Sequence, residues 1–184
     1  MGRQLIRIES DVTLTQYEPL TTLQLSLLAN EIRDELSQYR PEFSNLVTLQ
    51  RNCGCRVQEL FNVERWELTS NTMLKVDPQK GNATRILQLA DIGFPDAAAF
   101  ASTLSDIGRL PKRQYDRAFS LVVRQKNLWR LYEDGFAHPS THFFRHVKIK
   151  ELAAAGYDRG YIATWIGEKN PANLDYYLNS QYYT

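Results

Sequence analysis

Four short stretches of the chain each contain polar or cationic side chains that could take part in chemistry, on a predicted helix or turn. Arg56, in the run GCRVQEL, begins a predicted helix directly after a glycine, so its guanidinium could point into a cleft near the helix N-terminus. Lys80 lies in PQKGNATRIL, whose Gly-Asn pair favours a turn. His142 and Arg145 are three residues apart and share one helix face. The run NLDYYLNSQYYT carries four tyrosines near the C-terminus.

Three of these stretches also have an ordinary structural interpretation. Arg56 could be a surface arginine beside Glu59, Lys80 a solvated turn lysine, and the tyrosines amphipathic packing residues. The pair of His142 and Arg145 is harder to explain in this way. A buried helix face rarely holds both an imidazole and a guanidinium unless the two share a partner.

Charge is distributed unevenly along the chain. The net charge is only +1, which argues against a nucleic-acid partner at first sight. Between Arg109 and Lys150, however, ten basic residues stand against three acidic ones, a net charge of +7, so the rest of the chain carries −6. All three histidines lie in the same stretch. Charge alone does not decide between an anion-binding surface and a solvated helix face.

Length and composition define the class of protein. A chain of 184 residues with 43% hydrophobic and 23% charged residues predicts one globular domain rather than a disordered or disulfide-rich chain. The apolar runs are shorter than the ~18 residues needed to cross a bilayer, and the polar N-terminus lacks a signal-peptide core. We therefore expect a soluble cytoplasmic protein with no membrane partner. Cys53 and Cys55, one residue apart, are predicted to be reduced core residues.

The candidate residues must be positioned by a mostly helical framework. Two short runs rich in β-formers, 73–76 and 84–89, flank a turn and predict a β-hairpin with Lys80 at its tip. Helical patterns are predicted at 21–38, 42–52, 97–104, 112–132, 140–155, 158–166 and 171–179. Val57, Leu60 and Phe61 form one further apolar helical face. The predicted fold class is α+β, mostly helical, with a small antiparallel sheet.

Taken in order, these stretches resemble the sequence boxes of the tyrosine recombinase (phage integrase) family. GCRVQEL resembles the Gly-Leu-Arg-x-Ser-Glu-Leu box, and KGNATRILQL the Lys-Gly-Asn-x-x-Arg hairpin. THFFRH resembles the His-x-x-Arg-His box, and WIGEKNPANLDYYL the Leu-Gly-His…Tyr box. The resemblance runs from about residue 21 to 178. It implies a recombinase catalytic domain over 21–184 after an N-terminal extension over 1–20, without the N-terminal core-binding domain of typical recombinases.

The resemblance also implies a role for each residue. Arg56 and Arg145 would clamp the non-bridging oxygens of the scissile phosphate. Lys80 would act as general acid for the leaving 5′-hydroxyl, and His142 would donate to the phosphate or act as general acid/base. Tyr177 would attack phosphorus and form a 3′-phosphotyrosyl link. No cofactor and no metal is implied.

Spacing within the last family box indicates which tyrosine would be the nucleophile. In the family, the nucleophile lies nine residues after a histidine position, which is Glu168 here, and this points to Tyr177. Tyr176 is the alternative. Glu168 departs from the family pattern because a carboxylate would bring negative charge toward the phosphate, unless it is protonated or accepts from the tyrosine hydroxyl.

The implied partner is double-stranded DNA, with self-association on DNA, a cytoplasmic nucleoid-associated location and a role in integration or mobile-element recombination. The residues expected to contact DNA are Arg113, Arg117, Arg124 and Lys126. Two alternatives remain. One is a DNA-binding regulator on the same fold that has lost efficient cleavage, and the other is a type IB topoisomerase-like relaxing enzyme with a similar set of residues. A structural or protein-interaction module unrelated to DNA is the remaining possibility.

Overall fold

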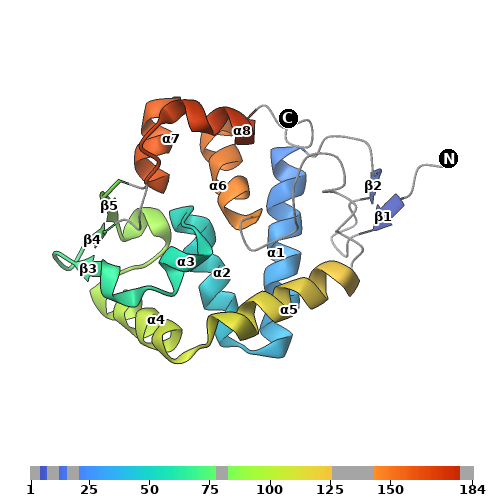
Figure 1. Cartoon of the computed structure of the whole chain (residues 1–184), viewed down its shortest axis with the longest axis horizontal. Helices are drawn as coiled ribbons and strands as arrows, with labels where there is room; N and C mark the ends of the chain where they lie inside the picture. The colour runs from blue at the N-terminus through green and yellow to red at the C-terminus, as the bar shows by residue number, and fades with distance from the viewer. Residues whose placement is uncertain (1–4, 8–12, 16–20, 78–82, 126–142, 179–184) are drawn as a thin grey trace.

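The computed structural model describes residues 5–7, 13–15, 21–77, 83–125 and 143–178, and helices make up most of them (Figure 1). The helices are α1 (Thr22–Tyr39), α2 (Glu42–Cys53), α3 (Val57–Leu60), α4 (Ala97–Arg109), α5 (Lys112–Gln125), α6 (Phe143–Ala154), α7 (Arg159–Ile166) and α8 (Asp175–Leu178). Within the described ranges, no helix is both long and apolar enough to span a bilayer. The predicted mostly helical class is confirmed.

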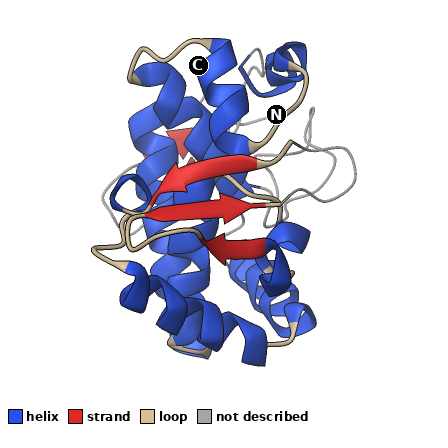
Figure 2. Cartoon of the chain, turned by 90° about the vertical axis from the view of Figure 1, so that its left-hand side faces the viewer, coloured by secondary structure: helices blue, strands red, loops and turns tan. Residues whose placement is uncertain are grey.

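A three-stranded antiparallel sheet lies at one side of the helices (Figure 2). It consists of β3 (Trp66–Leu68), β4 (Met73–Val76) and β5 (Arg85–Gln88) in the order β3-β4-β5. The predicted hairpin is confirmed as β4 and β5, while its tip at 78–82 lies outside the described residues. Strand β3 was not predicted, nor was the separate hairpin of β1 (Leu5–Arg7) and β2 (Thr13–Thr15).

Several helix ends differ from the sequence prediction. Helix α4 continues five residues past the predicted end at Leu104. The single helix predicted over 171–179 is a 3-10 turn at Pro171–Leu174 followed by the short α8. The end of α5 predicted at Tyr132 lies outside the described residues. The differences fall at element boundaries, where local sequence signals are weakest.

Helix α6 joins two hydrophobic cores. Its first part places Phe144 and Val147 in the larger core, which α1, α2, the sheet, α4 and α5 build. Its second part places Ile149 and Leu152 in a smaller core shared with α7 and α8. Because α6 is covered on most sides, its charged residues Arg145 and Lys150 are buried. Polar side chains on α6 must therefore find partners inside the protein.

Two glycines in a left-handed conformation bring the ends of α2 and α7 close to the sheet and to each other. Gly54 ends α2 with φ +65°, and a Cβ there would lie 2.6 Å from Cγ2 of Ile166. Gly167 ends α7 with φ +76°, and a Cβ there would lie 2.5 Å from Nη1 of Arg85. Only glycine combines this backbone conformation with such close approach. The chain leaving each helix therefore enters the same region.

The two cysteines are free and fully buried, as predicted. Burial raises the pKa of Cys53 to about 12 and also raises that of Cys55. Both therefore remain neutral thiols at physiological pH and act as small packing residues below the turn that leads to Arg56.

Candidate active site

Arg56 stands at the start of α3, directly after the Gly54 turn. Its backbone N–H donates to Oε1 of Glu59, 3.3 Å away, which fixes the first turn of the helix. Its side chain is 36% exposed, and Nη2 lies 3.5 Å from Oε2 of Glu168. The guanidinium is therefore held between solvent and an interior carboxylate rather than being an ordinary surface group.

Arg145 is the central side chain of the site and is completely buried on α6. Its Nη1 donates to the carbonyl oxygens of Gly54 at 2.8 Å and Ile166 at 3.1 Å. These carbonyls lie at the C-terminal ends of α2 and α7, where helix dipoles concentrate negative charge. Burial lowers the pKa of Arg145, and interaction with the Tyr177 phenol counteracts part of that effect. A guanidinium keeps its charge at neutral pH despite such a change.

The other edge of the Arg145 guanidinium has no acceptor at bonding distance among the described residues, although the Tyr177 phenol interacts with this side chain. In the described part of the chain, Nε and Nη2 have no hydrogen-bond acceptor although both are buried. Nη2 is 3.8 Å from Oε2 of Glu168, too far for a hydrogen bond. Nε and Nη2 together form a two-pronged edge that suits two oxygens of a phosphate or carboxylate.

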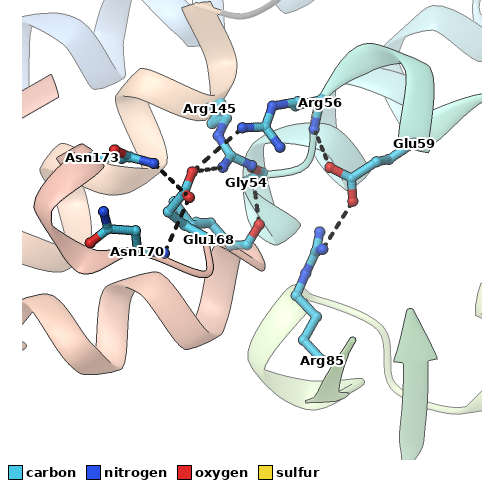
Figure 3. Close-up of polar contacts among 9 residues, drawn as sticks. Gly54, Arg56, Glu59, Arg85, Arg145, Glu168, Asn170 and Asn173 are labelled. Atoms are coloured by element: carbon cyan, nitrogen blue, oxygen red, sulfur yellow. Dashed lines mark hydrogen bonds and ion pairs between the residues drawn. The ribbon is translucent and has the colours of Figure 1, made fainter. Parts of the chain in front are cut away.

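Glu168 places its carboxylate beside the guanidinium groups of both arginines (Figure 3). Its side chain is 7% exposed. Oε2 faces both guanidinium groups, while Oε1 accepts from Nδ2 of Asn173 at 3.0 Å and from the backbone N–H of Asn170 at 3.4 Å. The sequence raised the possibility that Glu168 accepts from the tyrosine hydroxyl. Its contacts are instead with two cations and two amide donors.

Tyr177 on α8 reaches the same region. Its side chain is buried, and its ring meets the ring of His146 edge to face with centroids 4.3 Å apart. It also interacts with the Arg145 guanidinium. The phenol of the residue predicted as nucleophile therefore lies beside the arginine predicted to hold the phosphate. The structure does not describe the side chain of Tyr176.

A buried ion pair connects the sheet to the helices that carry the site. Nη1 of Arg85 lies 3.0 Å from Oε2 of Glu59, and both side chains are 1% exposed. The backbone N–H of Ala83 donates to the carbonyl of Gly167 at 2.9 Å. Together these contacts fix β5 against the start of α3 and the end of α7 (Figure 3).

Sequence reasoning did not identify Glu59 and Arg85 as supports of the site. It considered Glu59 only as a neighbour of a surface arginine. One signal was available: Arg85 alternates with Leu87, and both face the interior from β5. An arginine at an inward position of a strand requires a buried anionic partner.

The structure thus brings together four of the six residues predicted to act in catalysis: Arg56, Arg145, Glu168 and Tyr177. They come from the start of α3, from α6, from the turn after α7 and from α8. Lys80 and His142 lie outside the described residues, as does Lys126 of the predicted DNA contacts. Their roles remain predictions from the sequence.

The other predicted DNA contacts lie on one face of α5. Arg113, Arg117 and Arg124 are exposed and, with Ser120 and Leu121, line an open groove of about 490 Å³. Asp116 also lines this groove, and its carboxylate is 2.6 Å from Nζ of Lys112. The helix therefore presents a face whose exposed charge is mainly positive.

Other basic residues of the 109–150 stretch have structural partners. Nζ of Lys148 lies 4.8 Å above the centre of the Trp165 ring. Nζ of Lys150 donates to the carbonyl of Leu178 at the end of α8, 3.3 Å away. The net charge of +7 counted along the sequence is therefore not a single continuous surface. Part of it stabilises the packing of α6 against α7 and α8.

The sequence matches no protein-family model and no curated protein significantly. Among solved structures it is similar to the XerA recombinase, with a TM-score of 0.57 and 17% identity over 87% of this chain and 60% of that chain. It is also similar to the XerH site-specific recombinase bound to palindromic difH substrate in a post-cleavage complex, with a TM-score of 0.56 and 12% identity over 89% of this chain and 50% of that one. The pre-cleavage XerH complex with difH gives a TM-score of 0.56 and 12% identity, covering 93% and 55% of the two chains.

The chain therefore spans about half to three fifths of the length of these recombinases. At such identities the similarity concerns the fold, and residue roles must come from the site itself. On that basis, the chain has the mostly helical fold with a small antiparallel sheet that is found in the tyrosine recombinases XerA and XerH.

Proposed function

We propose that this chain is the catalytic domain of a site-specific tyrosine recombinase, which cleaves and rejoins double-stranded DNA through Tyr177. The observation that carries the proposal is the buried edge of Arg145, whose Nε and Nη2 lack acceptors in the described part of the chain. Arg56 and the Tyr177 phenol lie beside this guanidinium. Two cationic forks with an adjacent phenol are suited to nucleophilic attack on a phosphodiester.

Cleavage exchanges one phosphate ester bond for another, so the energy of the broken phosphodiester is retained in the enzyme–DNA link. The Tyr177 oxygen forms a bond to phosphorus as the bond from phosphorus to the 5′-oxygen breaks, which leaves a 3′-phosphotyrosyl link and a free 5′-hydroxyl. The phenol proton passes to a base, for which the sequence suggests His142, and Lys80 protonates the leaving oxygen. Arg56 and Arg145 stabilise the charge on the non-bridging oxygens. Attack by a 5′-hydroxyl on the link rejoins the strand.

Direct capture of the covalent intermediate tests this function without knowledge of the target site. The purified chain is incubated with a duplex library that carries random inserts and 5′-bridging phosphorothiolate linkages, which prevent rejoining. We expect complexes that survive SDS, a recurring sequence among the captured duplexes, and a nucleotide-modified peptide containing Tyr177 by mass spectrometry. Absence of any SDS-stable complex, or attachment outside 173–178, contradicts the proposal.

DNA as the partner is supported by the α5 groove and by the fold shared with XerH, whose structures contain difH substrate. Replacing Arg113, Arg117 and Arg124 together with Gln should weaken duplex binding strongly at low salt. Log K for DNA association decreases with log salt. If each arginine contacts one phosphate, this dependence should become less steep by about 0.9 for each arginine lost, as measured by fluorescence anisotropy. The matched triple Lys variant keeps the charge and should stay within a few fold of the unmodified chain. An unchanged slope in the Gln variant removes α5 from the DNA interface.

The position of Glu168 favours one second candidate, a DNA-binding regulator on the same fold that has lost efficient cleavage. Its carboxylate lies where a scissile phosphate would be clamped. Such a regulator would give sequence-specific gel shifts without nicking, and Glu168→His would not restore cleavage. Adduct formation by the unmodified chain decides against it.

A further inference from the structure

We propose that Glu168 is an internal occupant of the phosphate position, so that a DNA phosphate binds only when the Glu168 carboxylate moves away from Arg56 and Arg145. This inference rests on the proposed function, because it takes a DNA phosphate as the ligand of the site. It assigns to Glu168 the regulation of access to that site.

The first argument is electrostatic. Oε2 of Glu168 is 3.5 Å from Nη2 of Arg56 and 3.8 Å from Nη2 of Arg145, and the carboxylate is 7% exposed. A phosphodiester carries the same single negative charge as this carboxylate. Two such groups beside the same pair of guanidinium ions would repel each other strongly in a poorly solvated place. Entry of the phosphate therefore requires the carboxylate to leave.

The second argument is geometric. The contacts from Glu168 to the arginines neutralise charge without using the buried donors, because Nε and Nη2 of Arg145 have no hydrogen-bond acceptor within the described ranges. Nε and Nη2 of Arg85 likewise have no acceptor among the described residues, so the Glu59–Arg85 pair differs only in its contact length, with Nη1 of Arg85 3.0 Å from Oε2 of Glu59. A permanent structural pair uses short hydrogen bonds, whereas Glu168 makes only long contacts to the two guanidinium groups.

The third argument concerns where the carboxylate can go. Oε1 of Glu168 already accepts from Nδ2 of Asn173 at 3.0 Å and from the N–H of Asn170 at 3.4 Å. These donors lie in the turn after α7 and are exposed, so a rotated carboxylate can keep amide partners while Oε2 moves toward solvent. With the Glu168 carboxylate in place the site carries a net charge of +1, and after its departure the two guanidinium groups alone carry +2.

This arrangement gives the site selectivity. Free phosphate and mononucleotides must displace Glu168 using only their own contacts with Arg56 and Arg145. A duplex bound along α5 delivers its phosphate at a high effective concentration and can drive the exchange. The closed site therefore discriminates against small phosphate compounds and opens to phosphate within bound DNA.

The test measures binding of inorganic phosphate to the full chain at constant ionic strength, by calorimetry and by the shift in melting temperature. We expect Glu168→Gln to bind phosphate about tenfold more tightly than the unmodified chain. Adding Arg56→Ala to this variant should remove the gain. Glu151→Gln is the matched control, because Glu151 also pairs with a partly buried arginine, Arg51, away from the site. Its phosphate affinity should not change.

Equal affinity in the Gln variant and the unmodified chain overturns the inference. If Glu168→Gln does not fold, Glu168→Asp provides a second variant, since the same charge is withdrawn by one methylene and a smaller gain is expected. A crystal structure of the unmodified chain with phosphate gives a direct result. Phosphate on Arg145 with the Glu168 carboxylate still beside both arginines contradicts the inference, and a rotated carboxylate supports it.

The two proposals fail separately. If the unmodified chain forms a covalent adduct but Glu168→Gln gains no phosphate affinity, only the inference about Glu168 is wrong. If the phosphate affinity rises as expected but no adduct forms with any duplex, the site binds phosphate and the proposed function is wrong.

Discussion

A Tyr177→Phe chain is expected to bind DNA normally and to form covalent adduct at least about 10³-fold more slowly than the unmodified chain. The substitution removes one oxygen, the attacking atom, and leaves the ring. The ring keeps its edge-to-face contact with His146 and its place in the smaller core, so the protein should still fold despite the loss of the interaction between the phenol and Arg145. Single-turnover adduct formation on captured duplexes, together with anisotropy for binding, measures both properties.

Tyr176→Phe provides the control for register. Adjacent residues on a helix point about 100° apart, so only one of two neighbouring phenols can face the arginines. Adduct formation by Tyr176→Phe should therefore stay close to that of the unmodified chain. Loss of adduct in this variant, with full activity in Tyr177→Phe, would move the nucleophile by one residue.

Replacement of Arg145 by Lys is expected to affect both catalysis and stability. An ammonium keeps the charge but lacks the planar fork, so it cannot donate to two carbonyls and to two phosphate oxygens at once. Loss of a phosphate donor should slow cleavage about 10²- to 10³-fold. Leaving the carbonyl of Gly54 or Ile166 without its donor should lower the free energy of unfolding by about 1–3 kcal/mol, as measured by urea denaturation.

Arg51→Lys is the matched control for this variant. Arg51 on α2 is partly buried, and it pairs with Glu151 and Asn30 away from the site. Its replacement should lower stability without changing the rate of adduct formation. An Arg145→Lys chain that cleaves as fast as the unmodified chain would exclude Arg145 from holding the phosphate.

Much of the fold could be predicted from the sequence, because helices and turns are indicated by residues that lie close together in the chain. Helical periodicity predicted α5 and α6, and the turn residues before β5 predicted the hairpin. The missed strand β3 has only three residues between a 3-10 turn and a bend, too few for an alternating pattern to stand out. The convergence of Arg56, Arg145 and Tyr177 could be expected from the resemblance but not from periodicity.

Contacts distant in the sequence could not be predicted in this way. The pairing of Glu59 with Arg85, and the position of Glu168 beside two arginines, depend on how α3, β5 and α7 meet. Counting charges along the sequence also suggested a larger basic surface than the described residues form. Burial determines which charges face solvent, and the count did not distinguish Lys150, which donates to the end of α8, from Arg117, which is exposed.

The bond from Arg145 to the carbonyl of Ile166 makes the site depend on the packing of the smaller core. Arg145 joins the end of α2, which belongs to the larger core, to the end of α7, which belongs to the smaller one. Small cooperative units often open more frequently than the whole protein unfolds. Each opening of α7 and α8 would carry away Glu168 and Tyr177 together. Hydrogen-exchange protection of α7 and α8 therefore sets an upper limit on the fraction of molecules that are competent for cleavage.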